Sequence, residues 1–190
     1  MNKIIFQALC REISFLIQAK GRAVLAIDGK AAAGKSSFAS ELAGQFTAPV
    51  IHMDDFFLPP ELRTEERYAQ PGGNIHYERF GEEVLPLLRE PRPFSYRRFD
   101  CHTMDYAEIV SVPDASLRIV EGAYALHPSF GKYYDLALFV DVEEGKQFQR
   151  IAARDGQDML PVFRDRWIPY ENQYIEACRV IDRCDHIIEY

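Results

Sequence analysis

The sequence of 190 residues has few cysteines, fewer basic than acidic residues and no long apolar run. Its four cysteines form no C-x-x-C pair and we expect no secretory leader, so the sequence indicates reduced thiols in a cytoplasmic protein. The formal net charge of −7 argues against nucleic acid or an anionic membrane as the main partner, because either would need a basic surface. Polar residues interrupt residues 1–20, which excludes a membrane span and predicts an amphipathic helix.

The chain is long enough for one complete core, since 47% of its residues are hydrophobic. Residues 58–114 differ from the rest: they are rich in proline, arginine and aromatic side chains that follow no clear strand period. We therefore predict a single domain at 1–190, with a core at 1–57 and 115–190 and an inserted lobe at about 58–114.

Residues 29–36 match the pattern G-x-x-x-x-G-K-[ST], after an apolar run and before a helical pattern. Gly29 and Gly34 leave room for the backbone to wrap an anion, so that amide groups point at phosphate oxygens. Lys35 is expected on the outer phosphates and Ser36 on Mg²⁺. The predicted nucleotide-binding residues are Gly29, Lys30, Ala31, Ala32, Ala33, Gly34, Lys35, Ser36 and Ser37. The alternative is an ordinary glycine-rich turn.

Strand and helix patterns alternate along the chain, which predicts a doubly wound, mainly parallel α/β sheet of five strands. The expected strands are 24–28, 50–53, 117–122, 136–141 and 186–190. The expected helices after the first are 36–46, 77–89 with a kink at Pro86, 143–155 and 159–179.

Acidic residues follow two of these strands. Asp54 and Asp55 come after strand 50–53, which we expect beside the strand that precedes the glycine-rich loop, and Asp54 is the better candidate for a base that deprotonates an acceptor hydroxyl. The alternative is that both aspartates cap a turn. Glu121 ends the next strand, where a carboxylate would hold Mg²⁺ through water; the alternative is a solvated strand end.

Two arginines are candidates for the transferred charge. Arg150 and Arg154 lie four residues apart on one helix face, so both can close on the phosphates as catalytic cations. The alternative is a surface face of ion pairs with neighbouring acidic residues. In the lobe, Tyr96, Phe99 and His102 suit a planar base on a sugar, or else form a small core with a surface histidine.

Three blocks together resemble one family. Residues 27–36, 52–57 and 120–122 are similar to the uridine kinase and nicotinamide riboside kinase branch of the P-loop kinases. The resemblance implies transfer of the γ-phosphoryl group of Mg-ATP to the 5′-hydroxyl of a ribonucleoside, with Asp54 as the catalytic base. By the same analogy the chain is a possible homo-oligomer.

The resemblance points to two acceptors. The segment from Tyr96 to His102 is similar to the base-recognition segment of uridine kinases, whereas 54–57 and 163–170 look more like nicotinamide riboside kinases. Residues 71–80 resemble a uridine-kinase-like bacterial set in which an aspartate is usual at position 76. The predicted acceptor-binding residues are Asp55, Phe56, His76, Tyr96, Phe99 and His102.

We expect uridine or cytidine as the small-molecule acceptor. Nicotinamide riboside, pantothenate or a sugar phosphate is the first alternative. A protein of another class, which binds a nucleoside triphosphate, hydrolyses it slowly and regulates a partner, is the second; a usual GTPase is disfavoured because no N-K-x-D motif occurs.

Overall fold

The computed structural model describes residues 3–190, and its centre is one parallel sheet in the order β2-β5-β1-β6-β7. The strands are β1 Ala23–Gly29, β2 Val50–His52, β5 Leu117–Glu121, β6 Leu136–Asp141 and β7 His186–Glu189. All four strand pairs of this sheet are parallel, which confirms the predicted α/β fold. One expectation was wrong: β5, not β2, is the neighbour of β1 on that side.

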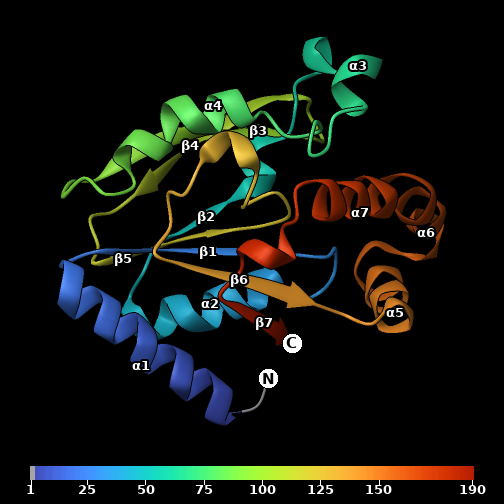
Figure 1. The fold of residues 1–190 in the computed structure, drawn as a ribbon. Coiled ribbons are helices and arrows are strands. Elements are labelled where there is room, and N and C mark those ends of the chain that lie inside the picture. The colour runs from blue at the N-terminus through green and yellow to red at the C-terminus, as the bar shows by residue number, and fades with distance from the viewer. Residues whose placement is uncertain (1–2) are drawn as a thin grey trace.

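Helices surround the sheet in three groups (Figure 1). Helices α1 (Lys3–Lys20) and α2 (Lys35–Phe46) pack on one face, and α4 (Tyr77–Glu83) lies over the other. Helices α5 (Glu144–Asp155), α6 (Leu160–Val162) and α7 (Ile168–Ala177) stand beyond the carboxyl ends of the strands, and α3 (Glu65–Tyr68) lies above them. Residues 1 and 2 of the predicted first helix lie outside the described residues. No helix within residues 3–190 is long and apolar enough to cross a membrane.

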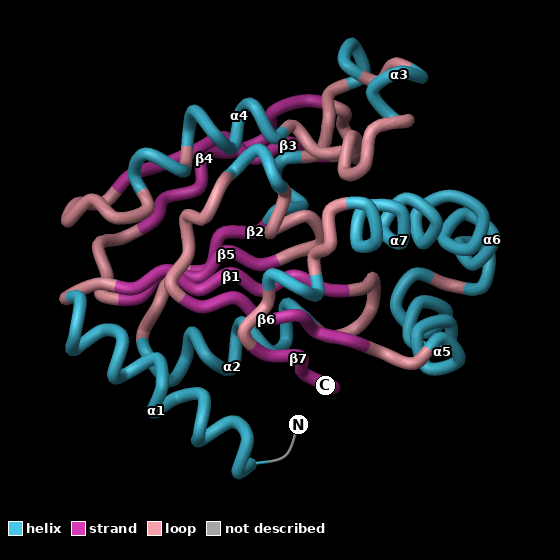
Figure 2. Tube along the Cα trace, viewed as in Figure 1, coloured by secondary structure: helices cyan, strands magenta, loops and turns pink. Residues whose placement is uncertain are grey.

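The middle strand explains why the sequence shows an unbroken apolar run there. Every residue of β1 is buried. Because successive side chains of a strand point to opposite faces, Val24 and Ala26 join the apolar cluster under α4, whereas Leu25 and Ile27 join the cluster under α1 and α2. Figure 2 shows this layered arrangement, with the magenta strands between cyan helices.

The lobe contains an antiparallel hairpin that the sequence analysis missed. Strands β3 (Phe94–Asp100) and β4 (Asp105–Val112) pair with a register shift between Arg97 and Phe99, and that irregularity disturbs the alternation by which a strand is recognised. Helix α4 ends at Glu83, earlier than predicted, and Pro86 lies in a separate 3₁₀ turn. The lobe shares its apolar cluster with the sheet, because Tyr96 packs with residues of β1.

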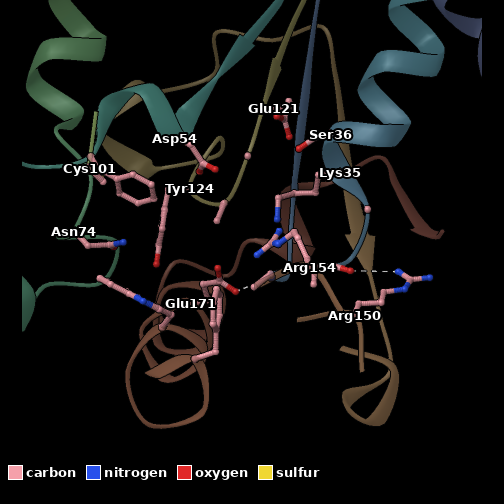
Figure 3. Close-up of a pocket in the computed structure, with 18 of the residues that line it drawn as sticks. Lys35, Ser36, Asp54, Asn74, Cys101, Glu121, Tyr124, Arg150, Arg154 and Glu171 are labelled. Carbon is pink, nitrogen blue, oxygen red and sulfur yellow. Dashed lines mark hydrogen bonds between the residues drawn. The ribbon is translucent and has the colours of Figure 1, made fainter. Parts of the chain in front are cut away.

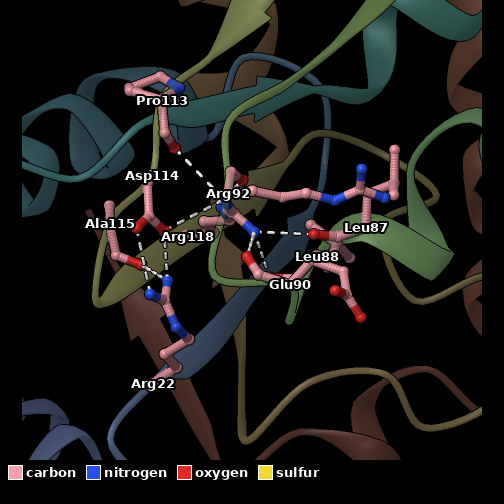
Figure 4. A network of polar contacts seen from close by, with 9 residues as sticks. All are labelled: Arg22, Leu87, Leu88, Glu90, Arg92, Pro113, Asp114, Ala115 and Arg118. Atoms are coloured by element: carbon pink, nitrogen blue, oxygen red, sulfur yellow. Dashed lines mark hydrogen bonds and ion pairs between the residues drawn. The ribbon is translucent and has the colours of Figure 1, made fainter.

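A buried arginine attaches the lobe to the sheet (Figure 4). Arg118, the second residue of β5, is only 1% exposed. Its guanidinium donates hydrogen bonds to the carbonyl oxygens of Leu87, Leu88, Glu90 and Arg92, at 2.8, 2.9, 3.0 and 2.7 Å. These carbonyls belong to the irregular chain after α4, so the guanidinium replaces the backbone partners that such a segment lacks.

Candidate functional site

The glycine-rich loop joins β1 to α2 as predicted, and its first glycine is required by its surroundings. Gly29 has a φ of +144° and lies against the backbone of β6, where a Cβ would come 2.1 Å from the carbonyl oxygen of Val140. Any larger residue would therefore push the loop away from the sheet. The side chain of Lys35 turns back over this loop and donates to the carbonyl oxygens of Gly29 and Lys30, at 2.9 and 2.8 Å.

Side chains from the helices beyond the sheet hold the loop from the other side. Glu171 of α7 accepts a hydrogen bond from the amide of Ala31 at 2.8 Å, and Gln147 of α5 donates to the carbonyl of the same residue at 3.0 Å. Arg150 of α5 donates to the carbonyl of Ala33 at 3.0 Å. Both backbone groups of Ala31 are thus engaged, so its amide does not face an anion as predicted.

A cavity of about 760 Å³ opens in front of the loop (Figure 3). Ten residues predicted for the site line it: Ala31, Ala32, Gly34, Lys35, Ser36, Ser37, Asp54, Glu121, Arg150 and Arg154. Three predicted loop residues do not: Gly29 lies against β6, Ala33 is fully buried, and the ammonium of Lys30 pairs with Asp141 at 2.7 Å. The structure therefore brings the predicted phosphate-binding and acidic residues to one cavity.

Asp54 projects into this cavity from a short 3₁₀ helix, Met53–Phe56, that follows β2 directly. The side chain is open to the cavity but has protein on most sides. This confinement raises the pKa of its carboxyl group, Glu121 raises it further, and the charge of Lys35 opposes both. A carboxylate with a raised pKa holds a proton more readily than one in water.

Glu121 is oriented by a neighbour that the sequence analysis missed. His52, the last residue of β2, lies 2.5 Å through Nδ1 from Oε1 of Glu121, and this hydrogen bond raises the pKa of His52. The other carboxylate oxygen, Oε2, is buried and has no partner among the described residues. The strand register places His52 opposite Glu121, which explains the pairing.

The donor set at this point fits Mg²⁺. The orphaned oxygen of Glu121 and the hydroxyl of Ser36 lie on the same cavity, and hard oxygen donors are what Mg²⁺ prefers. Residues 3–190 hold no group of three or more His, Cys, Asp or Glu side chains arranged for a metal.

The two candidate arginines differ. Arg150 is half-buried and its guanidinium is occupied by backbone carbonyls: that of Ala33 and, at 2.8 Å, that of Tyr190. It lines the cavity, but its guanidinium is held by these carbonyls and supports the loop. Arg154 is exposed, lies 2.9 Å from the carboxylate of Asp155 and lines the cavity, so it is the cation with freedom to move.

None of the six predicted acceptor-binding residues lines the cavity. Tyr96 donates to the buried carboxylate of Asp55 at 2.7 Å, and Phe56 packs against Tyr96 and Phe80 in the core. The remaining three have other roles: Phe99 is buried beside Tyr106, His76 accepts a hydrogen bond at the start of α4, and His102 is exposed in the hairpin turn. The alternative interpretation, a small core with a surface histidine, describes the 96–102 segment.

Other residues form the cavity wall instead. Sequence analysis singled out neither Asn74 nor Tyr124, which stand in loops, nor Glu171, which stands in a predicted helix. Trp167 lines the cavity from the end of a π-helical turn, Phe163–Trp167, and such turns often mark functional sites. Burial raises the pKa of Glu171 to about 7, and Lys35 opposes that shift.

No protein-family model matches this sequence. Among solved structures, a possible uridine kinase from Bacillus stearothermophilus aligns with a TM-score of 0.66 and 21% identity over 95% of this chain and 99% of that chain. A protein assigned as a fructose transport system kinase from Silicibacter sp. TM1040 aligns with a TM-score of 0.65 and 22% identity over 95% of this chain and 97% of that chain. Identities this low establish the fold alone. The chain has the fold of uridine kinase-like P-loop proteins.

Proposed function

We propose that this chain is an ATP-dependent kinase that transfers the γ-phosphoryl group of Mg-ATP to a hydroxyl group of a small molecule. The observation that carries the proposal is the meeting of Lys35, Ser36, Asp54 and Glu121 on one cavity. A glycine-rich loop alone binds nucleotide, whereas a carboxylate facing it from the end of another strand of the sheet also provides for an acceptor.

The residues have separate roles in this proposal. Ser36 and Glu121 would hold Mg²⁺, which neutralises charge on the β- and γ-phosphates when bound. Lys35 exchanges the loop carbonyls for phosphate oxygens, since an ammonium group binds an anion more strongly than a neutral carbonyl. Asp54 accepts the proton of the attacking hydroxyl, and its raised pKa makes it a stronger base than an aspartate in water. Arg154 moves toward the transferred charge.

The acceptor is the open part of the proposal. The sequence favoured uridine or cytidine through residues 96–102, but those side chains do not reach the cavity. The cavity has an aromatic wall formed by other residues, namely Phe57, Tyr68 and Trp167, and this wall can cover a sugar or a base. The first acceptors to test are uridine, cytidine, nicotinamide riboside, pantothenate and ribose phosphates.

The test is ADP release from Mg-ATP in the presence of each acceptor. We expect one acceptor to raise the rate, and Asp54→Asn to lower that rate by about 10²- to 10⁴-fold while ATP binding stays within about twofold. Asp182→Asn is the matched control, because Asp182 is an exposed residue outside the cavity wall. ATP binding with a slow rate that no acceptor changes would instead support a regulatory protein.

A further inference from the structure

Glu171 is fixed in place although it lies on a cavity wall. The residue is 9% exposed, and its Oε2 accepts the hydrogen bond from the amide of Ala31. One turn further along α7, the hydroxyl of Tyr174 donates to the buried carboxylate of Asp28 at 2.8 Å, which ties the helix to β1. The Ala31 hydrogen bond fixes one oxygen of the Glu171 carboxyl group, and the Tyr174 hydrogen bond fixes the helix that carries it. The other oxygen therefore has a defined orientation.

The second oxygen of Glu171, Oε1, is available to accept a hydrogen bond. Oε1 has no hydrogen-bond partner within residues 3–190, and Figure 3 shows it directed to the side of the cavity where Asp54 and Tyr124 lie. Asp54 and Glu171 line the same cavity, and the charge of Asp54 contributes to the raised pKa of Glu171. Asn74 and the buried Tyr124 stand beside them, so four polar side chains from four separate segments face one space.

The backbone at Tyr124 supports a binding role for this space. Tyr124 has a φ of +73°, a left-handed conformation that a bulky side chain rarely adopts, and it is 2% exposed. Strain of this kind persists where the surrounding structure holds a side chain in a required position. Here it brings the Tyr124 hydroxyl toward Asn74 and Glu171.

The charges around this space select among acceptors. Lys35 and Arg150 are already bonded to backbone carbonyls of the glycine-rich loop, on the nucleotide side. Of the other two arginines on the cavity, Arg154 pairs with Asp155 and Arg63 donates to the carbonyl of Leu58. Two carboxyl groups, Asp54 and Glu171, face the acceptor side. Above about pH 7, where Glu171 is ionised, a phosphate or carboxylate placed beside them would be repelled, whereas a hydroxyl group would donate a hydrogen bond to the free oxygen.

We propose that Glu171 is an acceptor-binding residue, and that its free oxygen accepts a hydrogen bond from a second hydroxyl of a polyhydroxylated acceptor that carries no anionic group near the reacting hydroxyl. The inference rests on the proposed kinase function and names its substrate class. We therefore expect polyols, sugars and nucleosides to be acceptors, and sugar phosphates and carboxylates to be excluded.

The experiment compares acceptors that keep the same primary hydroxyl and differ by an anionic group: ribose against ribose 1-phosphate, and uridine against orotidine. Wild-type enzyme is expected to favour the uncharged member of the pair it uses by at least tenfold in kcat/KM. Glu171→Gln keeps an oxygen for the Ala31 amide and the volume of the side chain, but its amide can offer a donor to the cavity. We expect this variant to raise the KM for the uncharged acceptor by about 10- to 100-fold, with the KM for ATP within about twofold.

Glu176→Gln is the control, because Glu176 lies on the exposed face of the same helix. Preference of the wild type for the anionic member would overturn the inference while leaving the kinase intact. A Glu171→Gln variant that raises the KM for ATP and leaves that for the acceptor would show a loop anchor instead. No acceptor-dependent turnover by the wild type would overturn the proposed function, and this inference with it.

Discussion

Replacement of Arg118 tests whether one buried cation holds the lobe to the sheet. Its guanidinium donates to four carbonyls within 3.0 Å, and a hydrogen bond from a charged donor contributes about 1.5–3 kcal/mol. Burial lowers the pKa of Arg118, because the charged guanidinium loses its contact with water. Replacing Arg118 with an uncharged residue removes this desolvation cost, which offsets part of the lost hydrogen bonding. We take about half of the gross contribution as the net effect, so Arg118→Met is expected to lower the free energy of unfolding by about 4 kcal/mol.

The assay is urea unfolding followed by tryptophan fluorescence and far-ultraviolet circular dichroism. Arg22→Met is the matched control, because Arg22 belongs to the same network but lies at its outer edge, paired with the exposed carboxylate of Asp114. Its loss should cost at most about 1 kcal/mol. Equal midpoints for the two variants would refute the reasoning, since they would show that the four carbonyls find other partners without strain.

Two further predictions concern the loop and its anchor. Gly29→Ala places a Cβ on the Val140 carbonyl and should cost about 4 kcal/mol, whereas Gly44→Ala, in open space on α2, should stabilise by about 0.5–1 kcal/mol; comparable midpoints in thermal unfolding would contradict this. The pKa of Glu171 is raised from 4.5 to about 7, so the native state holds a proton that the unfolded chain releases, and the stabilisation present at low pH is lost as pH rises toward 7. The free energy of unfolding of the wild type relative to Glu171→Gln should fall by about 2 kcal/mol between about pH 5 and pH 8, and a rise or a flat difference would show that Glu171 is ionised throughout.

The core of the fold could be predicted from the sequence because its signals are local. The apolar run ending at Gly29 is a strand buried on both faces, and the loop after it carries fixed residue types at fixed spacing. Asp54 was found because it follows the short strand β2 and Glu121 because it ends β5, and parallel strands bring their carboxyl ends to one edge. Strand order was predicted less well, since nothing in the sequence of β2 says that β5 intervenes.

The acceptor side could not be predicted, because its residues meet only through tertiary packing. Tyr96 is of a residue type that often stacks on a base, but its hydroxyl donates a hydrogen bond to the buried Asp55. Glu171 looks like any polar position of a helix, and only the docking of α7 on the loop brings it to Ala31. His52 is likewise an ordinary strand residue until the register sets it opposite Glu121.

Transfer of label from [γ-³²P]ATP to an acceptor, measured for the wild type and for Asp54→Asn, tests whether this chain is a kinase that uses Asp54 as its base. We expect the wild type to produce labelled acceptor. We expect Asp54→Asn to lower kcat by about 10²- to 10⁴-fold while its affinity for ATP is unchanged. Label released only as inorganic phosphate at a rate that no acceptor alters, or equal labelling of the acceptor by Asp54→Asn, would contradict it.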